Sequence, residues 1–354
     1  MNLYGRDMDR SALHRRTGDV ASVGGVRAVV LDDGAERGVR ALEFRTGTGL
    51  AFDVLVDRAM DIGPTEHGGA SVGWRSATGF RHPGLHEYAD EGGLSWLRSF
   101  SGLMVTAGLD HTLFTAEVDA SSYRYPHRPT TWNGLHGRVA NIPAKLHGYG
   151  ETWHGDRCVL WAEGEIRQAA VFGENLHLLR RIEADLGGDE IRLTDTVTNA
   201  GFDRTPHMFL YHINLGWPLL DAGTRLEAPI EGTRWQSDSV AEQKADHLVF
   251  GEPLPGFVEQ VYEHDLTPGT DGRVQVRLVN DRLGLAFELD YDSAQFPAFL
   301  QWMHLREGAY ALGLEPSTHH VDGDQAARDD GSMIWLDAGE SRSYSTVFRI
   351  TRSR

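Results

Sequence analysis

The chain has 354 residues, and 34 lysines and arginines against 51 aspartates and glutamates give a formal net charge of −17. Such an acidic chain repels polyphosphates and anionic lipids, so nucleic acids and membrane surfaces are not expected partners. Neutral sugars are not excluded, because hydrogen bonds and aromatic faces recognise them. One domain is expected over residues 1–354, with residues 1–49 as its less securely assigned N-terminal portion.

The N-terminal segment and the cysteine content bear on the compartment. The first 20 residues are charged throughout and lack the apolar segment of a secretory signal peptide. No later run approaches the roughly 20 apolar residues that span a bilayer. Cys158 is the single cysteine, so no intramolecular disulfide can form, and its strand-like surroundings predict a buried structural thiol. These features predict a cytoplasmic protein and leave its oligomeric state open.

Alternation of apolar and polar residues dominates the chain, as in LAFDVLVDRAMDIG from Leu50 and RVQVRLVNDRLGLAFELDYD from Arg273. Alternation is typical of strands that bury one face. Two strand-like runs flank residues 187–189 (Gly-Gly-Asp), which indicates a hairpin. Helical periodicity is weak, and the best short candidates, residues 87–100 and 240–247, could equally be loops. The sequence therefore predicts an all-β chain of mainly antiparallel strands with few short helices.

The first polar insertion in chain order is VDRAMDIG at residues 56–63. An arginine fork can bind vicinal hydroxyls or a carboxylate, so Arg58 is a candidate substrate contact, together with Asp61. The alternative is a network of charges that satisfy one another and bind no ligand.

The second insertion is GLHGRVANIPA at residues 134–144. His136 stands between Leu135 and Gly137, and the glycine would permit close approach by a substrate. We therefore expect His136 to contact substrate, although a turn histidine at the surface is the alternative.

The third insertion, YHINLG, lies at residues 211–216. In an extended strand, His212 and Asn214 point to one face, which would place a titratable group beside a neutral hydrogen-bonding group. His207 should point to the opposite face and serve a structural role. The competing interpretation of His212 is a buried histidine whose nitrogen is satisfied by a backbone carbonyl.

The fourth insertion places Glu315 in an otherwise apolar strand, YALGLEPS. The last three insertions each carry a histidine or a glutamate among apolar neighbours, and such a set could converge on one proton-transfer site. Gly313 shares its face and would leave room for a ligand or another backbone. A partly desolvated glutamate has a raised proton affinity, which suits proton transfer near neutral pH. The alternative is an ion pair with an arginine such as Arg306 or Arg138.

Trp302 and His304, in FLQWMHLREG, share one face of the preceding strand-like run. An indole can provide a flat apolar surface for a pyranose ring, although core packing is the commoner role of a tryptophan. We include both residues as candidate substrate contacts.

Taken in order, GLHGR, YHINL and LGLEP resemble the motifs of aldose 1-epimerases. The chain is most similar to the bacterial aldose 1-epimerase-like branch called DUF4432, through VDRAMDIG, FSGLMVTAGLDHT, GLHGRVANIPA, YHINLGWPLL and QWMHLREGAYALGLEP. The resemblance implies a galactose mutarotase-like β supersandwich with a sugar site in a cleft. Tyr211 stands where the aldose 1-epimerase pattern has an asparagine before the histidine.

The resemblance also implies a reaction. His212 would be the acid and Glu315 the base of a ring opening that interconverts sugar anomers, with the two groups on opposing walls of the cleft. His136 would lie near the sugar. The substrate would be a monosaccharide or a sugar derivative, and the chemistry requires no metal and no cofactor.

Two other functions remain open from the sequence. One is a metal-assisted isomerase, epimerase or lyase acting on a keto sugar, which would use some of His136, His212, His304, His319, His320 and Glu315. However, adjacent His319 and His320 would diverge on a regular strand, and no compact metal-binding spacing is present. The other is a carbohydrate-binding protein without turnover.

Overall fold

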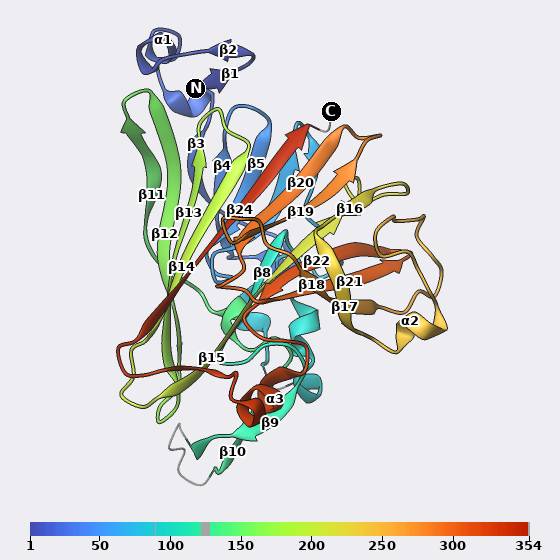
Figure 1. Cartoon of the computed structure of the whole chain (residues 1–354). Coiled ribbons are helices and arrows are strands. Elements are labelled where there is room, and N and C mark those ends of the chain that lie inside the picture. Colours follow the sequence, from blue (N-terminus) through green and yellow to red (C-terminus); the bar gives the residue numbers. More distant parts are fainter. Residues whose placement is uncertain (89, 122–127, 353–354) are drawn as a thin grey trace.

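Two large antiparallel sheets form the body of the protein in the computed structural model, which describes residues 1–88, 90–121 and 128–352 (Figure 1). One hydrophobic cluster fills the space between them and takes residues from both sheets, including Phe44 and Phe52 from one and Phe287 and Phe348 from the other. Close packing of two apolar sheet faces is the basis of a β sandwich. The predicted all-β architecture of antiparallel strands is confirmed.

The larger sheet has twelve strands among the described residues, and it carries most of the polar insertions. In spatial order its main path is β17 (Ile230–Gln236), β18 (Gln260–Leu266), β21 (Ala298–Arg306), β22 (Ala309–Ser317), β15 (Thr205–Gly216), β8 (Met104–Leu109), β6 (Asp61–His67), β5 (Leu50–Leu55), β4 (Arg40–Arg45) and β3 (Gly25–Val30). Two short strands pair at its side, β7 (Ala70–Ser71) with β6 and β23 (Ile334–Leu336) with β15.

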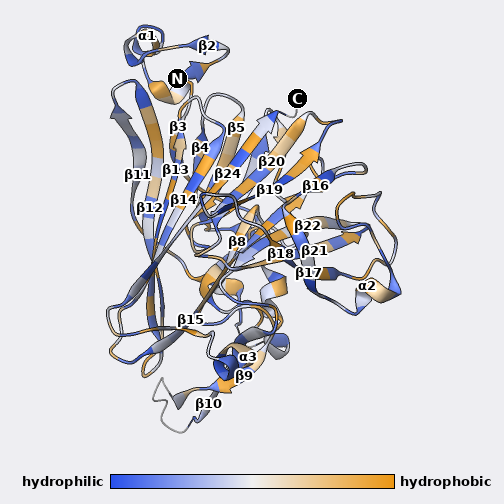
Figure 2. Ribbon diagram, in the orientation of Figure 1, coloured by the Kyte–Doolittle hydropathy of each residue, from blue (hydrophilic) through white to orange (hydrophobic). Residues whose placement is uncertain are grey.

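The smaller sheet has eight strands within the described ranges. Their order is β11 (Lys145–His154), β12 (Arg157–Ala169), β13 (Asn175–Asp185), β14 (Glu190–Asn199), β24 (Ser341–Arg352), β20 (Leu285–Asp292), β19 (Arg273–Asn280) and β16 (Arg225–Glu227). Hydrophilic and hydrophobic residues alternate along the strands of this sheet (Figure 2), and burial in β13 alternates with them. The predicted hairpin is confirmed, because β13 and β14 pair on either side of Gly187, whose φ is 83°.

Two hairpins lie outside the sheets: β1 (Asn2–Leu3) with β2 (Arg6–Asp7), and β9 (Ala116–Asp119) with β10 (Thr130–Asn133). The described helices are α1 (Arg10–His14), α2 (Ser239–Glu242) and α3 (Gly323–Asp330). None of them is long and apolar enough to cross a membrane.

The two segments with helical periodicity form shorter structures than an α-helix of their length. In residues 87–100 the described part contains 3-10 turns at Asp90–Gly93 and Ser95–Arg98. Glu91, Gly92 and Gly93 have φ values of 53°, 66° and 89°, and the left-handed region interrupts a right-handed helix. In the second segment, the short helix α2 ends at Glu242, five residues before His247.

Strand β15 is buried along its whole length and lies between β22 and β8. Its antiparallel register pairs Ile213 with Leu314 and Leu210 with Ser317, which places His212 opposite Glu315 on β22. Directly opposed side chains on neighbouring strands lie within contact distance. The sheet therefore brings together two residues that are 103 positions apart in the sequence.

Candidate active site

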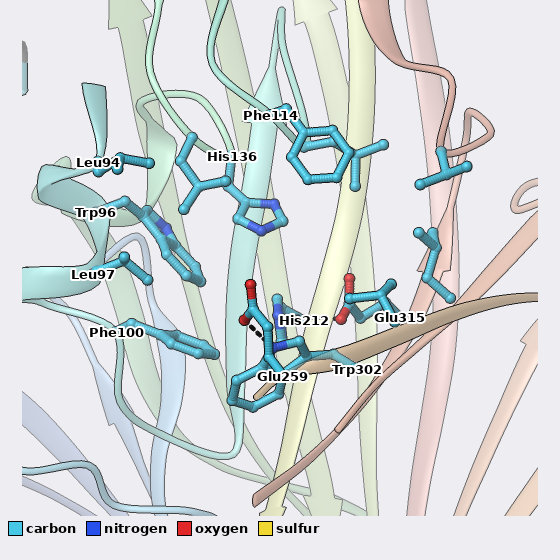
Figure 3. Close-up of a pocket in the computed structure, with 15 residues that line it drawn as sticks. Leu94, Trp96, Leu97, Phe100, Phe114, His136, His212, Glu259, Trp302 and Glu315 are labelled. Atoms are coloured by element: carbon cyan, nitrogen blue, oxygen red, sulfur yellow. Dashed lines mark hydrogen bonds and ion pairs between the residues drawn. The ribbon is translucent and has the colours of Figure 1, made fainter. Parts of the chain in front are cut away.

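A cavity of about 280 Å³ lies over β15, β21 and β22 and is closed on one side by the segment 94–100 (Figure 3). Among the described residues, its lining consists of Leu94, Trp96, Leu97, Phe100, Leu113, Phe114, Leu135, His136, His212, Glu259, Val261, Leu300, Trp302, Glu315 and Val321. The cavity thus unites His136, His212, Trp302 and Glu315, four of the eight residues that the sequence analysis selected.

His212 and Glu315 contact each other inside this cavity. The Nε2 atom of His212 lies 3.2 Å from Oε1 of Glu315, and both side chains are about 4 % exposed. Gly313 makes the contact possible, because a Cβ atom at this position would lie 2.9 Å from Cε1 of His212 and 3.1 Å from Oε1 of Glu315. The space expected beside Gly313 is therefore filled by these two side chains.

Burial sets the protonation of the pair. It raises the pKa of Glu315 to about 8, and the negative charge of Glu259 adds to the increase. It lowers the pKa of His212 well below its ordinary value, with a further decrease from His136. Taking a charged group out of water favours its neutral form. At neutral pH the Glu315 carboxyl is therefore protonated and the His212 imidazole is neutral, so the pair shares one exchangeable proton and has no net charge.

His136 reaches the same cavity from a left-handed turn with φ of 58°. The turn is fixed by the backbone, since the amide of His136 donates to the carbonyl of Leu113 and its carbonyl accepts from Gly108. Gly137 also has positive φ, and a Cβ there would meet the Gly108 carbonyl oxygen at 2.3 Å. The group that closely approaches Gly137 is therefore a backbone carbonyl, where the sequence analysis expected a substrate.

The imidazole of His136 is held neutral and keeps one nitrogen available. Burial lowers its pKa to about 3, with a smaller effect from His111. Within the described part of the chain, its Nδ1 atom has no hydrogen-bond partner although it is buried. A buried polar atom without a partner is costly, and a substrate hydroxyl at this position would satisfy it.

Aromatic rings surround the imidazoles. Trp96 lies 4.6 Å from His136 between ring centroids, and Phe100 lies 4.7 Å from His212. Trp302 lies 5.5 Å from His212, and its Nε1 donates a 3.0 Å hydrogen bond to Oε2 of Glu259. This bond orients a second carboxylate at the cavity.

Comparison with known proteins identifies the family. The sequence profile described as a domain of unknown function, DUF4432, matches residues 36–350. The chain belongs to the DUF4432 family. The fold is also shared with solved structures, which confirms the galactose mutarotase-like architecture.

Three of these structures show the extent of the similarity. A proposed aldose 1-epimerase from Klebsiella pneumoniae has a TM-score of 0.82 at 21 % identity, with coverage of 93 % of this chain and 83 % of the other. A galactose mutarotase-like protein from Clostridium acetobutylicum has a TM-score of 0.61 at 11 % identity, covering 92 % and 98 %. Galactose 1-epimerase from Lactobacillus acidophilus has a TM-score of 0.56 at 11 % identity, covering 93 % and 99 %. At these identities the likeness establishes the fold.

Arg58 of this DUF4432 protein lies outside the lining of the cavity. Its guanidinium donates to the backbone carbonyls of Ala140, Arg81 and Ser99 and is buried, which lowers its pKa to about 10. An arginine whose donors are used in this way holds loops together. Arg58, which the sequence analysis selected as a substrate contact, is thus bonded to backbone carbonyls outside the cavity lining.

Asp61 also lies away from the cavity, in a buried ion network between the sheets. Arg180 contacts Asp61 at 2.9 Å and Asp195 at 2.6 Å. Thr106 donates to Asp61 from both its backbone and its hydroxyl group. Asp61 therefore belongs to a network of charges that satisfy one another, which was the alternative interpretation of VDRAMDIG. Its partners lie in distant segments of the sequence.

The Tyr211 hydroxyl of the DUF4432 chain donates a 2.7 Å hydrogen bond to Asp195 in the same network. Tyr211 therefore points into the sandwich core, while its neighbour His212 points into the cavity. Position 211, where the aldose 1-epimerase pattern has an asparagine, therefore does not belong to the cavity lining.

Asn214 and His304 do not line the cavity. The Asn214 amide donates to the carbonyls of Gly102 and His212, and a small effect of this residue raises the pKa of His212. Nδ1 of His304, near the end of β21, donates a 3.1 Å hydrogen bond to the carbonyl of Ala309, the first residue of β22. Asn214 thus supports the strand beneath the cavity. His304 shares the strand face of Trp302 but lies two residues further along β21, beyond the cavity lining.

The remaining histidines of the metal hypothesis are engaged elsewhere. His319 bonds Thr318, and His320 bonds the buried Glu263, so the two adjacent side chains diverge as predicted. In the described ranges, no group of three or more His, Cys, Asp or Glu side chains is arranged to hold a metal ion.

Sequence reasoning missed Trp96, Phe100 and Glu259. Trp96 and Phe100 follow two glycines in a segment with a weak helical pattern, and aromatic residues in a glycine-flanked loop were the available signal. Glu259 follows a Pro/Gly-rich loop just before β18, and no local pattern distinguishes it from a surface glutamate.

Proposed function

We propose that the protein interconverts the anomers of a cyclic hemiacetal sugar by acid/base ring opening. The observation that carries the proposal is the direct contact of His212 with Glu315 inside a cavity. The two oxygens that exchange protons in this reaction, the anomeric hydroxyl and the ring oxygen, are bonded to the same carbon. An acid and a base that lie side by side suit this substrate better than groups on opposing walls.

The reaction begins from the neutral pair. Glu315 gives its proton to the ring oxygen while the bond from the anomeric carbon to that oxygen breaks. Nε2 of His212 takes the proton of the anomeric hydroxyl, whose oxygen becomes the carbonyl oxygen of the open sugar. Rotation about the next carbon–carbon bond presents the other carbonyl face, and reclosure returns both protons.

This assignment of acid and base is the reverse of the one that the family resemblance implies. The reason is burial, which raises the pKa of Glu315 to about 8 and lowers the pKa of His212. In the open-chain state the pair becomes an imidazolium beside a carboxylate, so its net charge stays zero throughout. A low-dielectric cavity tolerates this change, because the two new charges stabilise each other.

The test is anomer exchange, followed by NMR or polarimetry with a panel of reducing sugars. We expect the wild-type protein to accelerate exchange of at least one sugar, and Glu315→Gln to abolish the acceleration without unfolding. Glu151→Gln, on the exposed face of β11, is the matched control and should retain full activity. Saturable sugar binding with no acceleration would instead favour the binding protein, and loss of activity with a chelator would favour the metal-assisted reaction.

A further inference from the structure

The cavity separates a small polar part from a large apolar part. Of its fifteen described lining residues, eleven are aliphatic or aromatic, and the other four are His136, His212, Glu259 and Glu315. Figure 3 shows Leu94, Trp96, Leu97 and Phe100 together along one side. No lysine, arginine, serine, threonine, asparagine or glutamine belongs to the described lining.

This lining limits the number of hydroxyl groups that can bind. In the proposed reaction, His212 and Glu315 are occupied by the anomeric hydroxyl and the ring oxygen. His136 and Glu259 are then the ionisable residues left for all other hydroxyls, and Glu259 already accepts a hydrogen bond from Trp302. A hydroxyl that is buried against leucine or phenylalanine loses its bonds to water and gains none in return.

Apolar surface continues to the mouth of the cavity. Leu94 is 44 % exposed, Leu97 is 52 % exposed and Phe114 is 57 % exposed, yet all three line the cavity. A ligand with an apolar flank would cover this surface and remove it from water, which is favourable.

The charges present also select against anions. Glu259 and Glu315 are carboxyl groups, and the described lining holds no lysine or arginine. The pKa values of His136 and His212 are both lowered, so these imidazoles are neutral near pH 7. A phosphate or carboxylate on the substrate would be desolvated here without a positive partner.

We propose that the substrate is an uncharged, hydroxyl-poor cyclic hemiacetal, such as a deoxysugar or a sugar with an apolar substituent. This inference rests on the proposed ring opening and adds the substrate class. The hemiacetal edge faces His212 and Glu315, and the apolar flank lies against the aromatic and aliphatic walls.

Three sugars that differ only at C6 provide the test. D-galactose carries a hydroxymethyl group, D-fucose a methyl group and D-galacturonate a carboxylate. We expect kcat/KM for anomer exchange to be about tenfold higher for D-fucose than for D-galactose, because the methyl group leaves no hydroxyl unpaired. D-galacturonate should show no acceleration. Equal or higher kcat/KM for D-galactose or D-galacturonate would overturn the inference while the ring-opening proposal stands.

A rim variant locates the preference in the cavity. Leu97→Asn should reduce the ratio of D-fucose to D-galactose activity severalfold, because an amide replaces apolar surface at the mouth. The matched control is Leu179→Asn, on β13 of the other sheet, where the leucine is 41 % exposed; it should leave the ratio unchanged. An unchanged ratio in the folded Leu97→Asn protein would contradict the role of the rim.

A binding measurement separates this inference from the proposed function. Methyl D-fucoside and methyl D-galactoside cannot open, and their binding can be followed by the fluorescence of Trp96 and Trp302, which line the cavity. If no hemiacetal is accelerated, the proposed function fails, and tighter binding of methyl D-fucoside still supports a hydroxyl-poor ligand. Tighter binding of methyl D-galactoside would overturn that ligand class as well.

Discussion

The carboxylate of Glu259 acts on Glu315 across the cavity, and its negative charge helps burial to raise the pKa of Glu315. Glu259 immediately precedes β18 and is held by Trp302 on β21, whereas Glu315 lies on β22. The proton affinity of Glu315 is therefore set by both the sheet that buries it and a charge at the cavity.

Activity should fall as the pH rises through about 8. The pKa of Glu315 is raised above its ordinary value, so the proton that the reaction requires is present below pH 8 and is lost above it. The measurement is kcat/KM for anomer exchange against pH, corrected for the uncatalysed rate. A rate that keeps rising above pH 8 would show that the pair works after losing this proton.

Glu259→Gln should move this decline to lower pH. Removing the negative charge weakens the increase in the pKa of Glu315, while glutamine can still accept the hydrogen bond of Trp302. The same pH profile provides the measurement, with Glu252→Gln in the preceding loop as the control. A decline in activity that stays at the same pH would contradict the electrostatic link between the two carboxyl groups.

Arg180→Met should lower the free energy of unfolding by about 3–5 kcal/mol, because it leaves the buried carboxylates of Asp61 and Asp195 without their cation. Arg181, the next residue, pairs with Glu163 and Glu183 and is 37 % exposed. Arg181→Met should therefore cost less than about 1 kcal/mol. Chemical denaturation measures the free energy of unfolding of both variants. Equal losses would contradict a larger contribution of the buried ion pairs than of the exposed ones.

Gly313→Ala should lower kcat by about tenfold to a hundredfold, since a methyl group would push His212 and Glu315 from their present contact. Gly232→Ala, in β17 of the same sheet, meets only Asp265 at 4.0 Å and is the matched control. Comparison of kcat in the two folded variants is the measurement. Full activity in Gly313→Ala would mean that the close contact is not needed.

The strands, the hairpin at residues 187–189 and the convergence of His212 with Glu315 could be predicted from the sequence. Alternation is a local signal, and strand parity places a histidine or glutamate on a definite face. The family resemblance then supplied the proximity of the two strands. Their direct contact, in place of opposing walls, follows from the register of β15 with β22, which no local pattern encodes.

Other parts of the site depend on partners that are distant in the sequence. Arg58 was selected for its chemistry, but its donors are taken by carbonyls of three other segments. Asp61 pairs with Arg180, which lies 119 residues away in the sequence. Trp96 lies in a short 3-10 turn and Glu259 lies just before β18, and no local sequence pattern places either of them at the cavity.

A double-variant cycle tests most directly whether His212 and Glu315 form one proton-carrying unit. Anomer exchange is measured for His212→Asn, Glu315→Gln and the double variant, all shown to be folded. We predict that each single variant loses as much of the acceleration as the double variant, because neither group works without the other. Losses that multiply in the double variant, or full acceleration in either single variant, would contradict a shared proton.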